Sequence, residues 1–118
     1  MSEPCIFCEI AAGRMDADIV HQDDKVVAFK DIHPQAPVHL LIIPRKHIPT
    51  MQHIEAGDAE LIGHMHLVAQ ELAREYGVAE DGYRSVFNCG TQGGQMVWHI
   101  HLHLLGGRSM GWPPWPGN

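Results

Sequence analysis

Cysteine is scarce in this chain, and its number is odd. Three cysteines occur in 118 residues, which argues against a framework of disulfide bonds. Cys5 and Cys8 form a C-x-x-C pair, whereas Cys89 stands alone. In a reducing compartment such a pair more often serves metal or redox chemistry than a structural bridge. We therefore expect a site at Cys5 and Cys8, and a buried, inert thiol at Cys89.

Basic residues and long apolar runs are also lacking. Lys and Arg number 8 against 14 Asp and Glu, so the formal net charge is −6. That balance argues against broad binding to nucleic acid or to an anionic membrane, because both need a basic surface. No stretch of the sequence is long and apolar enough to span a bilayer. The first four residues lack the basic and apolar regions of a secretion signal, so we expect a cytoplasmic protein.

Length and composition fit one folded domain over residues 1–118. A chain of this size can bury a core without disulfides. Hydrophobic residues make up 45% and charged residues 19%, which is typical of globular and not of disordered chains. The tail, residues 111–118, contains Trp112-Pro113-Pro114 and is too rich in proline to form a regular helix.

Hydrophobic patterning predicts strands, then a helix, then strands again. The expected elements are a short helix or turn over 5–12, strands over 19–22, 25–30, 38–43, 83–88 and 96–105, and a helix from Asp58 to about Tyr76. Asp58 suits the N-cap of that helix and Gly77 its end; its apolar stripe comprises Leu61, Met65, Val68, Leu72 and Tyr76. Short connections favour antiparallel pairing. The predicted fold is therefore α+β, a five-stranded antiparallel sheet with one long helix packed on it.

Histidine is abundant, with ten residues, and three of them alternate in the last predicted strand. Because side chains alternate between the faces of a strand, one face would carry His99, His101 and His103. The other face would enter the core with Trp98, Ile100, Leu102 and Leu104. Neighbouring histidines of the row would lie about 6.5–7 Å apart, too far to bond directly. Such a row suits one extended ligand, such as a phosphate with its leaving group.

A row of histidines fits metal binding or a solvated face as well as catalysis. Two features favour catalysis. The strand follows Asn88 and the glycine-rich loop Gly93-Gly94-Gln95, whose backbone N–H groups can bind an anion. His39, at the head of the strand over 38–43, can add a fourth histidine. A tight turn and a core histidine are the plain structural alternatives for these two features.

The segment from His99 to Leu105 matches the motif His-φ-His-φ-His-φ-φ, in which φ is apolar. In this motif the chain resembles the histidine triad family, and over nearly its whole length it is similar to the Hint branch of nucleotide phosphoramidases. The blocks that carry this similarity include Phe29-Lys30-Asp31-Ile32, Pro34-Gln35-Ala36-Pro37-Val38-His39, Ile43-Pro44-Arg45-Lys46-His47, Gly93-Gly94-Gln95, Leu105-Gly106-Gly107-Arg108 and Trp112-Pro113-Pro114. The Trp-Pro-Pro tail separates that branch from diadenosine polyphosphate hydrolases and uridylyltransferases.

The resemblance implies a homodimer whose two antiparallel sheets join, with a purine nucleotide as ligand. His101 would be the nucleophile that takes the nucleotidyl group and then loses it to water. A backbone carbonyl would orient its other ring nitrogen. His103 would bond the phosphate or the leaving group, and His39 would support the row that His99 begins.

The resemblance also assigns the nucleotide contacts. Asn88 and the backbone around Gly94 and Gln95 would hold phosphate oxygens, and Asp31 would accept the ribose hydroxyls. Trp112 would reach toward the partner's site. The base slot would be lined by Phe7, Phe29, Ile32 and Leu41. The structural alternatives are core packing for the apolar residues, a turn role for Asp31, and packing of Trp112 on its own protomer.

Some histidine triad relatives carry a C-x-x-C pair and bind zinc, and their ligands correspond here to Cys5, Cys8, His47 and His99. A Cys2His2 set is apt for tetrahedral zinc. With all four positions filled by protein, the site would be structural. Two reduced cysteines beside an ordinary loop histidine are the alternative, because C-x-x-C alone is not specific.

The sequence departs from the Hint branch at two positions. Met96 stands where relatives commonly have a serine or another polar residue near the phosphate, and His33 replaces a common serine beside the ribose region. The expected function is cleavage of the P–N bond in purine nucleoside 5′-phosphoramidates, which are adducts of AMP or GMP with an amine. The alternatives are a dinucleoside polyphosphate hydrolase, a non-catalytic nucleotide-binding adaptor dimer, and a protein whose triad itself holds a metal.

Overall fold

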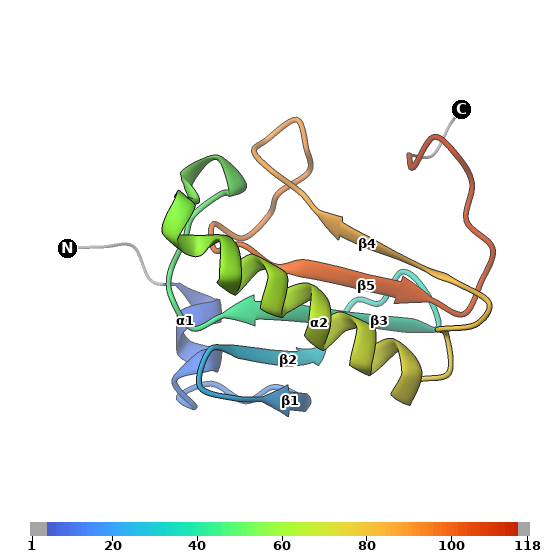
Figure 1. The fold of residues 1–118 in the computed structure, drawn as a ribbon, viewed down its shortest axis with the longest axis horizontal. Helices are drawn as coiled ribbons and strands as arrows, with labels where there is room; N and C mark the ends of the chain where they lie inside the picture. The colour runs from blue at the N-terminus through green and yellow to red at the C-terminus, as the bar shows by residue number, and fades with distance from the viewer. Residues whose placement is uncertain (1–4, 116–118) are drawn as a thin grey trace.

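The computed structural model describes residues 5–115. Residues 116–118 of the predicted tail therefore lie outside the described part. Its antiparallel sheet has five strands in the order β1-β2-β3-β5-β4. The elements are α1 (Ile6–Ala11), β1 (Ile19–Gln22), β2 (Val26–Lys30), β3 (Val38–Pro44), α2 (Ala59–Glu75), β4 (Tyr83–Phe87) and β5 (Leu102–Gly106), with 3-10 turns at Met51–His53 and Ala56–Asp58. Figure 1 shows α2 lying across the sheet. The predicted α+β fold is confirmed, and no helix within residues 5–115 is long and apolar enough to cross a membrane.

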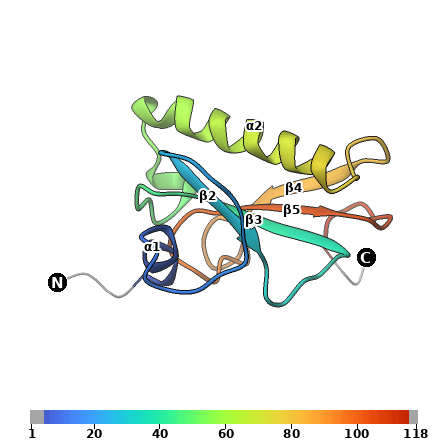
Figure 2. The same ribbon diagram turned by 90° about the horizontal axis from the view of Figure 1, so that it is seen from below.

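The sheet is covered on both faces, which explains the continuous apolar run of its central strand. In β3, Leu40 and Ile42 belong to the core cluster that contains the buried face of α2. Leu41 and Ile43 belong to a second cluster with Phe7 of α1. Figure 2 shows α2 and α1 on opposite sides of the sheet. A strand buried on both faces has no polar face to alternate with, so its sequence is apolar throughout.

Helix α2 forms where its sequence pattern placed it. Asp58 is its N-cap residue, and Gly77 follows its end with a φ of +72°, a conformation that favours glycine. The carboxylate of Asp58, however, does not cap α2. It accepts a hydrogen bond from the backbone N–H of Glu55 at 2.9 Å and one from Nζ of Lys46 at 2.6 Å. The predicted stripe is confirmed: its middle three residues are buried and its two ends pack against the core.

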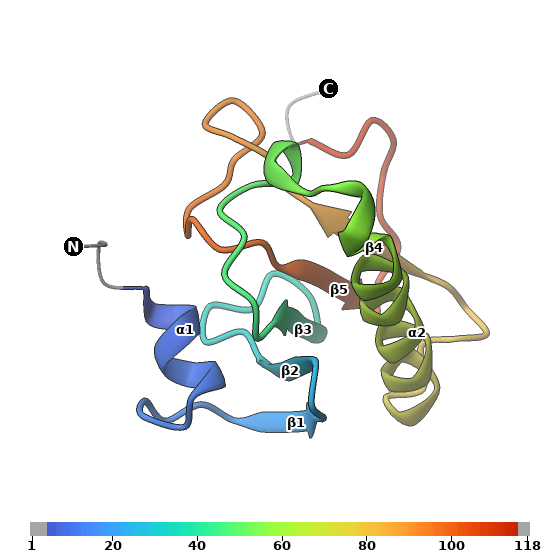
Figure 3. The same ribbon diagram turned by 60° about the vertical axis from the view of Figure 1, so that its left-hand side comes forward.

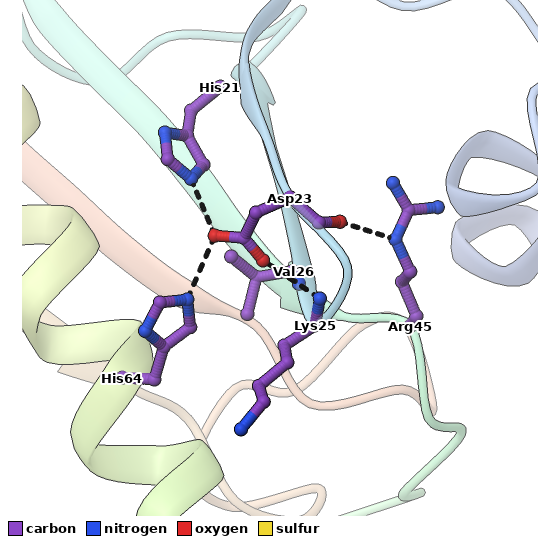
Figure 4. A network of polar contacts seen from close by, with 6 residues as sticks. All are labelled: His21, Asp23, Lys25, Val26, Arg45 and His64. Atoms are coloured by element: carbon purple, nitrogen blue, oxygen red, sulfur yellow. Dashed lines mark hydrogen bonds and ion pairs between the residues drawn. The ribbon is translucent and has the colours of Figure 1, made fainter.

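A carboxylate network that the sequence did not reveal ties the β1–β2 hairpin to α2 (Figure 4). Oδ1 of Asp23 accepts the backbone N–H groups of Lys25 and Val26 at 2.8 and 2.9 Å. Its Oδ2 lies 2.8 Å from Nε2 of both His21 and His64, the second of which belongs to α2. Burial alone would raise the pKa of Asp23, but these hydrogen bonds outweigh it and hold the pKa well below its usual range. The network therefore stabilises the charged carboxylate.

The last strand is shorter than predicted. The sequence placed a strand over 96–105, but β5 begins only at Leu102. Leu102 pairs with Ile42, so the same register would set Ile100 opposite Pro44. Proline has no N–H to donate, and the ladder ends there. The backbone N–H of Ile100 instead donates to the carbonyl of Ile48 at 2.8 Å.

Because residues 96–101 do not pair with β3, their side chains do not alternate between the two faces of the sheet as predicted. Trp98, expected in the core, is 49% exposed. Ile100, Leu102 and Leu104 are buried as predicted. The prediction of one regular histidine row on a strand is therefore wrong, because His99 and His101 lie in an irregular segment and only His103 lies in β5.

Candidate active site

His101 and His103 line a cavity of about 570 Å³ on the α1 side of the sheet. Figure 3 shows α1 and the segment that leads into β5 on the same side of β3. A cavity of this volume suits a ligand the size of a nucleotide. Most of the predicted site residues line it: Phe7, Phe29, Asp31, Ile32, His39, Leu41, Asn88, Gly94, His101 and His103. Three others, His99, Gln95 and Trp112, lie elsewhere.

A backbone carbonyl fixes the tautomer of His101. Nδ1 of His101 lies 2.8 Å from the carbonyl oxygen of His99. Because a carbonyl only accepts, Nδ1 carries the proton and Nε2 keeps its lone pair. Burial lowers the pKa of His101, against the opposing influence of that carbonyl and of Asp31. A neutral imidazole with a free Nε2 is a competent nucleophile, and the expected orientation by a carbonyl is present.

A chain of hydrogen bonds also fixes the tautomers of His39 and His103. The backbone N–H of Gln35 donates to Nδ1 of His39 at 3.0 Å. A neutral His39 must then carry its proton on Nε2, which lies 2.9 Å from Nδ1 of His103. His103 accepts at Nδ1 and so carries its own proton on Nε2. The chain therefore ends in an N–H donor on His103.

That donor belongs to a ring that lies beside the ring of His101. Nε2 of His103 is buried and has no hydrogen-bond partner within residues 5–115, although the residue lines the cavity. The ring centroids of His101 and His103 are 4.9 Å apart, closer than a regular strand would set them. Burial, with smaller contributions from His101 and His39, lowers the pKa of His103 to about 4. At neutral pH the site thus presents a lone pair and an N–H side by side.

Asp31 combines a turn role with a place in the cavity wall. Its Oδ1 accepts the backbone N–H of His33 at 2.8 Å, as the turn interpretation expected. Its Oδ2 lies 3.3 Å from Nε2 of His39. The two interpretations of Asp31 are therefore compatible, and the carboxylate is in direct contact with the histidine chain.

The predicted base slot is both core and cavity wall. Phe7, Phe29 and Leu41 are only 5–6% exposed and pack in the α1-side cluster. The ring of Phe7 contacts Phe29 edge-on at a centroid distance of 5.5 Å and His101 at 5.1 Å. Ile32, in contrast, is 85% exposed at the cavity rim.

Gln95 holds a loop together and does not line the cavity. Its side-chain amide bonds the backbone of Gly90, Pro49 and Val97 at 2.6–3.0 Å. Its own backbone N–H donates to the carbonyl of Gly90 at 3.0 Å, and the N–H of Gly94 is likewise bonded within the loop. In this structure these N–H groups are therefore engaged and do not point free toward an anion.

Packing explains the paired glycines of this loop. A Cβ on Gly93 would collide with the carbonyl of Cys89, and Gly94 adopts a φ of +85°. Cys89 itself is half-buried rather than buried. Asn88 and Met96, on either side of the glycines, line the cavity.

The four predicted metal ligands converge next to the predicted nucleophile, His101. Sγ of Cys5 lies 3.3 Å from Nδ1 of His99, and Sγ of Cys8 lies 3.3 Å from Nδ1 of His47 and 3.5 Å from Nδ1 of His99. All four donor atoms lie within 4.8 Å of one another. We call this set the thiol–histidine cluster. His99 is fully buried in this cluster. We predicted that its imidazole would share a face with His101, but it does not face the cavity.

The thiol–histidine cluster fits a tetrahedral metal. With usual zinc bond lengths, sulfur and nitrogen ligands of one ion lie about 3.6 Å apart, close to the distances found. Nε2 of His99 is 2.8 Å from the carbonyl of Pro44, which leaves Nδ1 as the coordinating atom. Burial and Cys5 raise the pKa of the Cys8 thiol to about 11. A bound divalent cation opposes that shift, because it coordinates the thiolate.

Trp112 lies outside the cavity of its own protomer. It is 84% exposed, so it makes little contact with the rest of the chain. It lines a separate hollow with Arg84 and Arg108. Whether it reaches a partner's cavity stays a prediction.

The cavity also has wall residues that the sequence analysis did not assign. Ile6 and Ile10 flank Phe7 on α1, and Met15 follows the helix. The spacing of Ile6 and Ile10 at i and i+4 was the available signal, because it places both on one helix face. Met96, noted only as a departure, is 86% exposed at the rim.

Comparison with known proteins identifies the family. The family model of the HIT domain matches residues 12–110. The purine nucleoside phosphoramidase of Escherichia coli (strain K12) is 50% identical over 111 residues, covering 94% of this chain and 93% of that protein. A HIT family hydrolase from Legionella pneumophila Philadelphia 1 is similar in structure, with a TM-score of 0.93 and 53% identity over 94% of this chain and 99% of that chain.

A second solved structure is also similar in fold. It is a zinc-bound histidine triad family protein from Mycobacterium smegmatis, with a TM-score of 0.78 and 30% identity over 95% of this chain and 80% of that chain. The chain therefore belongs to the HIT domain family of histidine triad proteins.

Proposed function

We propose that this protein hydrolyses the P–N bond of purine nucleoside 5′-phosphoramidates through a nucleotidyl-His101 intermediate. The observation that carries the proposal is the pairing of a free Nε2 on His101 with an unpartnered N–H on His103. Both lie at a cavity whose wall includes aromatic rings and the carboxylate of Asp31. The E. coli relative named a purine nucleoside phosphoramidase supports the same reaction class.

The cavity wall suggests how the nucleotide binds. The base lies against Phe7, Phe29 and Leu41 with Ile32 at the rim, because flat apolar rings bury best against apolar walls. The ribose hydroxyls donate to Asp31. The phosphate lies between Asn88, Gly94 and the two cavity histidines, so His101 is within reach of phosphorus. Gln95 contributes by holding the loop.

In the first step Nε2 of His101 attacks phosphorus. The new N–P bond forms as the P–N bond of the substrate breaks, and its electron pair leaves on nitrogen. The Nε2–H of His103 donates a hydrogen bond to the departing amine, which takes up one proton from solvent. His101 now carries a substituent on Nε2 and a proton on Nδ1, so it is a cation that the carbonyl of His99 still orients.

In the second step water attacks phosphorus from the side that the amine has left. The bond to Nε2 of His101 breaks, the nucleoside monophosphate departs, and one proton of the water is released to solvent. Proton uptake and release cancel over the cycle. Both steps use the same two histidines, so one arrangement of the site serves the whole reaction.

A structural zinc ion fits the thiol–histidine cluster. It would be held by the thiolates of Cys5 and Cys8 and by Nδ1 of His47 and His99. When bound, it cross-links α1 to the segments before and after α2 and supplies no group to the reaction. The chain's own contribution is positioning, because the backbone carbonyl of His99 orients the nucleophile.

The protein acts as a homodimer whose sheets join. Strand β4 forms one edge of the sheet, and its backbone groups on that side lack a strand partner within residues 5–115. Edge strands of this kind pair with another chain unless they are protected. In such a dimer the exposed Trp112 extends toward the partner's cavity. Light scattering should then give twice the chain mass.

The proposal is tested by release of AMP from adenosine 5′-phosphoramidate. We expect steady turnover by the wild type and a loss of at least about a thousandfold in His101→Ala. The matched control is His66→Ala, which removes an exposed imidazole on α2 outside the cavity. An inactive wild type that still binds AMP would instead favour a non-catalytic adaptor. Activity retained by His101→Ala would refute the assignment of the nucleophile.

A further inference from the structure

The carboxylate of Asp31 has two oxygens with different partners. Oδ1 is engaged by the backbone N–H of His33 in the turn. Oδ2 lies 3.3 Å from Nε2 of His39, whose side chain is only 3% exposed. The Asp31 side chain is 18% exposed, so this contact is largely shielded from water. A ribose contact alone does not require an oxygen aimed at a buried histidine.

The same Nε2 of His39 also donates to His103. It lies 2.9 Å from Nδ1 of His103, with which it forms a hydrogen bond, and 3.3 Å from Oδ2 of Asp31, so one nitrogen is in contact with both an imidazole and a carboxylate. The carboxylate thereby fixes the ring of His39, and through it the ring of His103. Its charge also opposes the effect of burial on the pKa of His39, His101 and His103.

Positive charge develops in this group of rings during the reaction. His101 becomes a cation when phosphorus bonds Nε2 while Nδ1 keeps its proton. A fixed negative charge in a site shielded from water stabilises such a cation more than it would in bulk solvent. The other charged residues of the cavity wall are Asp16, which is exposed, and Lys30, whose Nζ lies 3.6 Å from Asp18.

We propose that Asp31 is a positioning residue for the histidines in addition to a ribose contact. Through His39 it holds the ring of His103 in place, and its charge offsets the cation that forms on His101. This inference rests on the proposed function, because it concerns the barrier of that reaction. The ribose contact and the positioning role are separable by experiment, because only the first needs hydroxyl groups on the substrate.

The experiment compares wild type and Asp31→Asn on two substrates, adenosine 5′-phosphoramidate and its 2′,3′-dideoxy analogue. Asparagine keeps an oxygen for the turn bond from His33 and removes the charge. We expect kcat of Asp31→Asn to fall by roughly tenfold on both substrates, the scale of one charge-assisted hydrogen bond. The matched control is Asp24→Asn, which removes an exposed charge outside the cavity and should leave kcat within about twofold.

Wild-type protein provides a second arm that needs no variant. Removing the ribose hydroxyls should raise KM and leave kcat within about twofold, because Asp31 stays in contact with His39. The inference is overturned if Asp31→Asn has the kcat of the wild type on the dideoxy substrate, or if the wild type loses kcat on it. Turnover of neither substrate by wild type that binds AMP would overturn the proposed function itself, which is a different result.

Discussion

The carbonyl oxygen of His99 accepts the Nδ1–H of His101 at 2.8 Å, while the imidazole of His99 is buried among the thiols of Cys5 and Cys8. One residue thus belongs to two sites. Its side chain completes the thiol–histidine cluster, and its backbone fixes the tautomer of the residue two positions along. The thiol–histidine cluster and the proposed nucleophile His101 are therefore mechanically connected without sharing chemistry.

Loss of zinc from the thiol–histidine cluster should lower the stability of the fold more directly than it lowers the rate of the reaction. We expect protein purified without chelator to contain about one zinc per chain. Cys8→Ser should lose the ion and at least about 2 kcal/mol of stability, which lowers Tm by roughly 8 °C in a domain of this size. Cys89→Ser, which changes a cysteine outside the cluster, is the control. Elemental analysis and calorimetry measure both effects, and metal-free wild type would contradict the assignment of the four ligands.

The pH dependence of turnover should reflect the buried histidines. Burial lowers the pKa of His39, His101 and His103, in the last case to about 4. A lowered pKa keeps an imidazole neutral into more acidic solution, so activity is lost only as the pH falls through the lowered values. We expect the acid limb of kcat to lie below the usual histidine value of about 6.5. A pH–rate profile with Tm measured at each pH checks this, and an acid limb at the value of a free imidazole would argue against it.

The Asp23 network makes a separate prediction about stability. Asp23→Asn should cost about 2 kcal/mol at neutral pH, because it removes the charge that two histidines and two backbone N–H groups stabilise. The pKa of Asp23 is lowered in the folded state, so its contribution is fully present above its unfolded value and is lost as the pH falls toward the folded value.

The difference in Tm between wild type and Asp23→Asn should therefore be constant above about pH 5 and shrink below about pH 4. Asp24→Asn, an exposed neighbour in the same turn, provides the control. Thermal unfolding across this pH range gives the answer. Two curves that stay parallel down to the most acidic pH would rule out a role for the charge.

Met96 offers a test of the phosphate side of the cavity. It is 86% exposed at the rim, and a thioether donates no hydrogen bond. Met96→Ser should leave Tm nearly unchanged and tighten AMP binding by about fivefold, because a hydroxyl can donate to the phosphate. Met15→Ser, on the same cavity wall, should leave the affinity as it was. Calorimetric titration with AMP measures both, and weaker binding by Met96→Ser would place the phosphate elsewhere.

The sequence predicted the fold where periodicity is strong. The apolar run of β3 and the stripe of α2 identify their elements because burial there repeats with strand or helix geometry. The residue at which β5 begins was not predictable, because it depends on the partner strand. Pro44 breaks the ladder opposite Ile100. Such a pairing is a tertiary fact that no local pattern in residues 96–101 contains.

The sequence identified most residues of the site, but it did not predict the contacts that those residues make. The residues around the cavity were identified by their resemblance to a family, and the structure brings most of them together. The positions of the His99 and Gln95 side chains outside the cavity were not predictable. Each side chain contacts a segment distant in sequence: His99 contacts Cys5 and Gln95 contacts Pro49. The link between Asp31 and His39 likewise needs the three-dimensional arrangement.

Mass spectrometry of acid- and base-quenched protein during turnover of adenosine 5′-phosphoramidate tests the central claim most directly. The account predicts a transient covalent adduct with the mass of the adenylyl group, located on His101, labile in acid as a phosphorus–nitrogen bond should be, and absent from His101→Ala. Steady release of AMP with no adduct at any time of quenching, or an adduct on another residue, would contradict it.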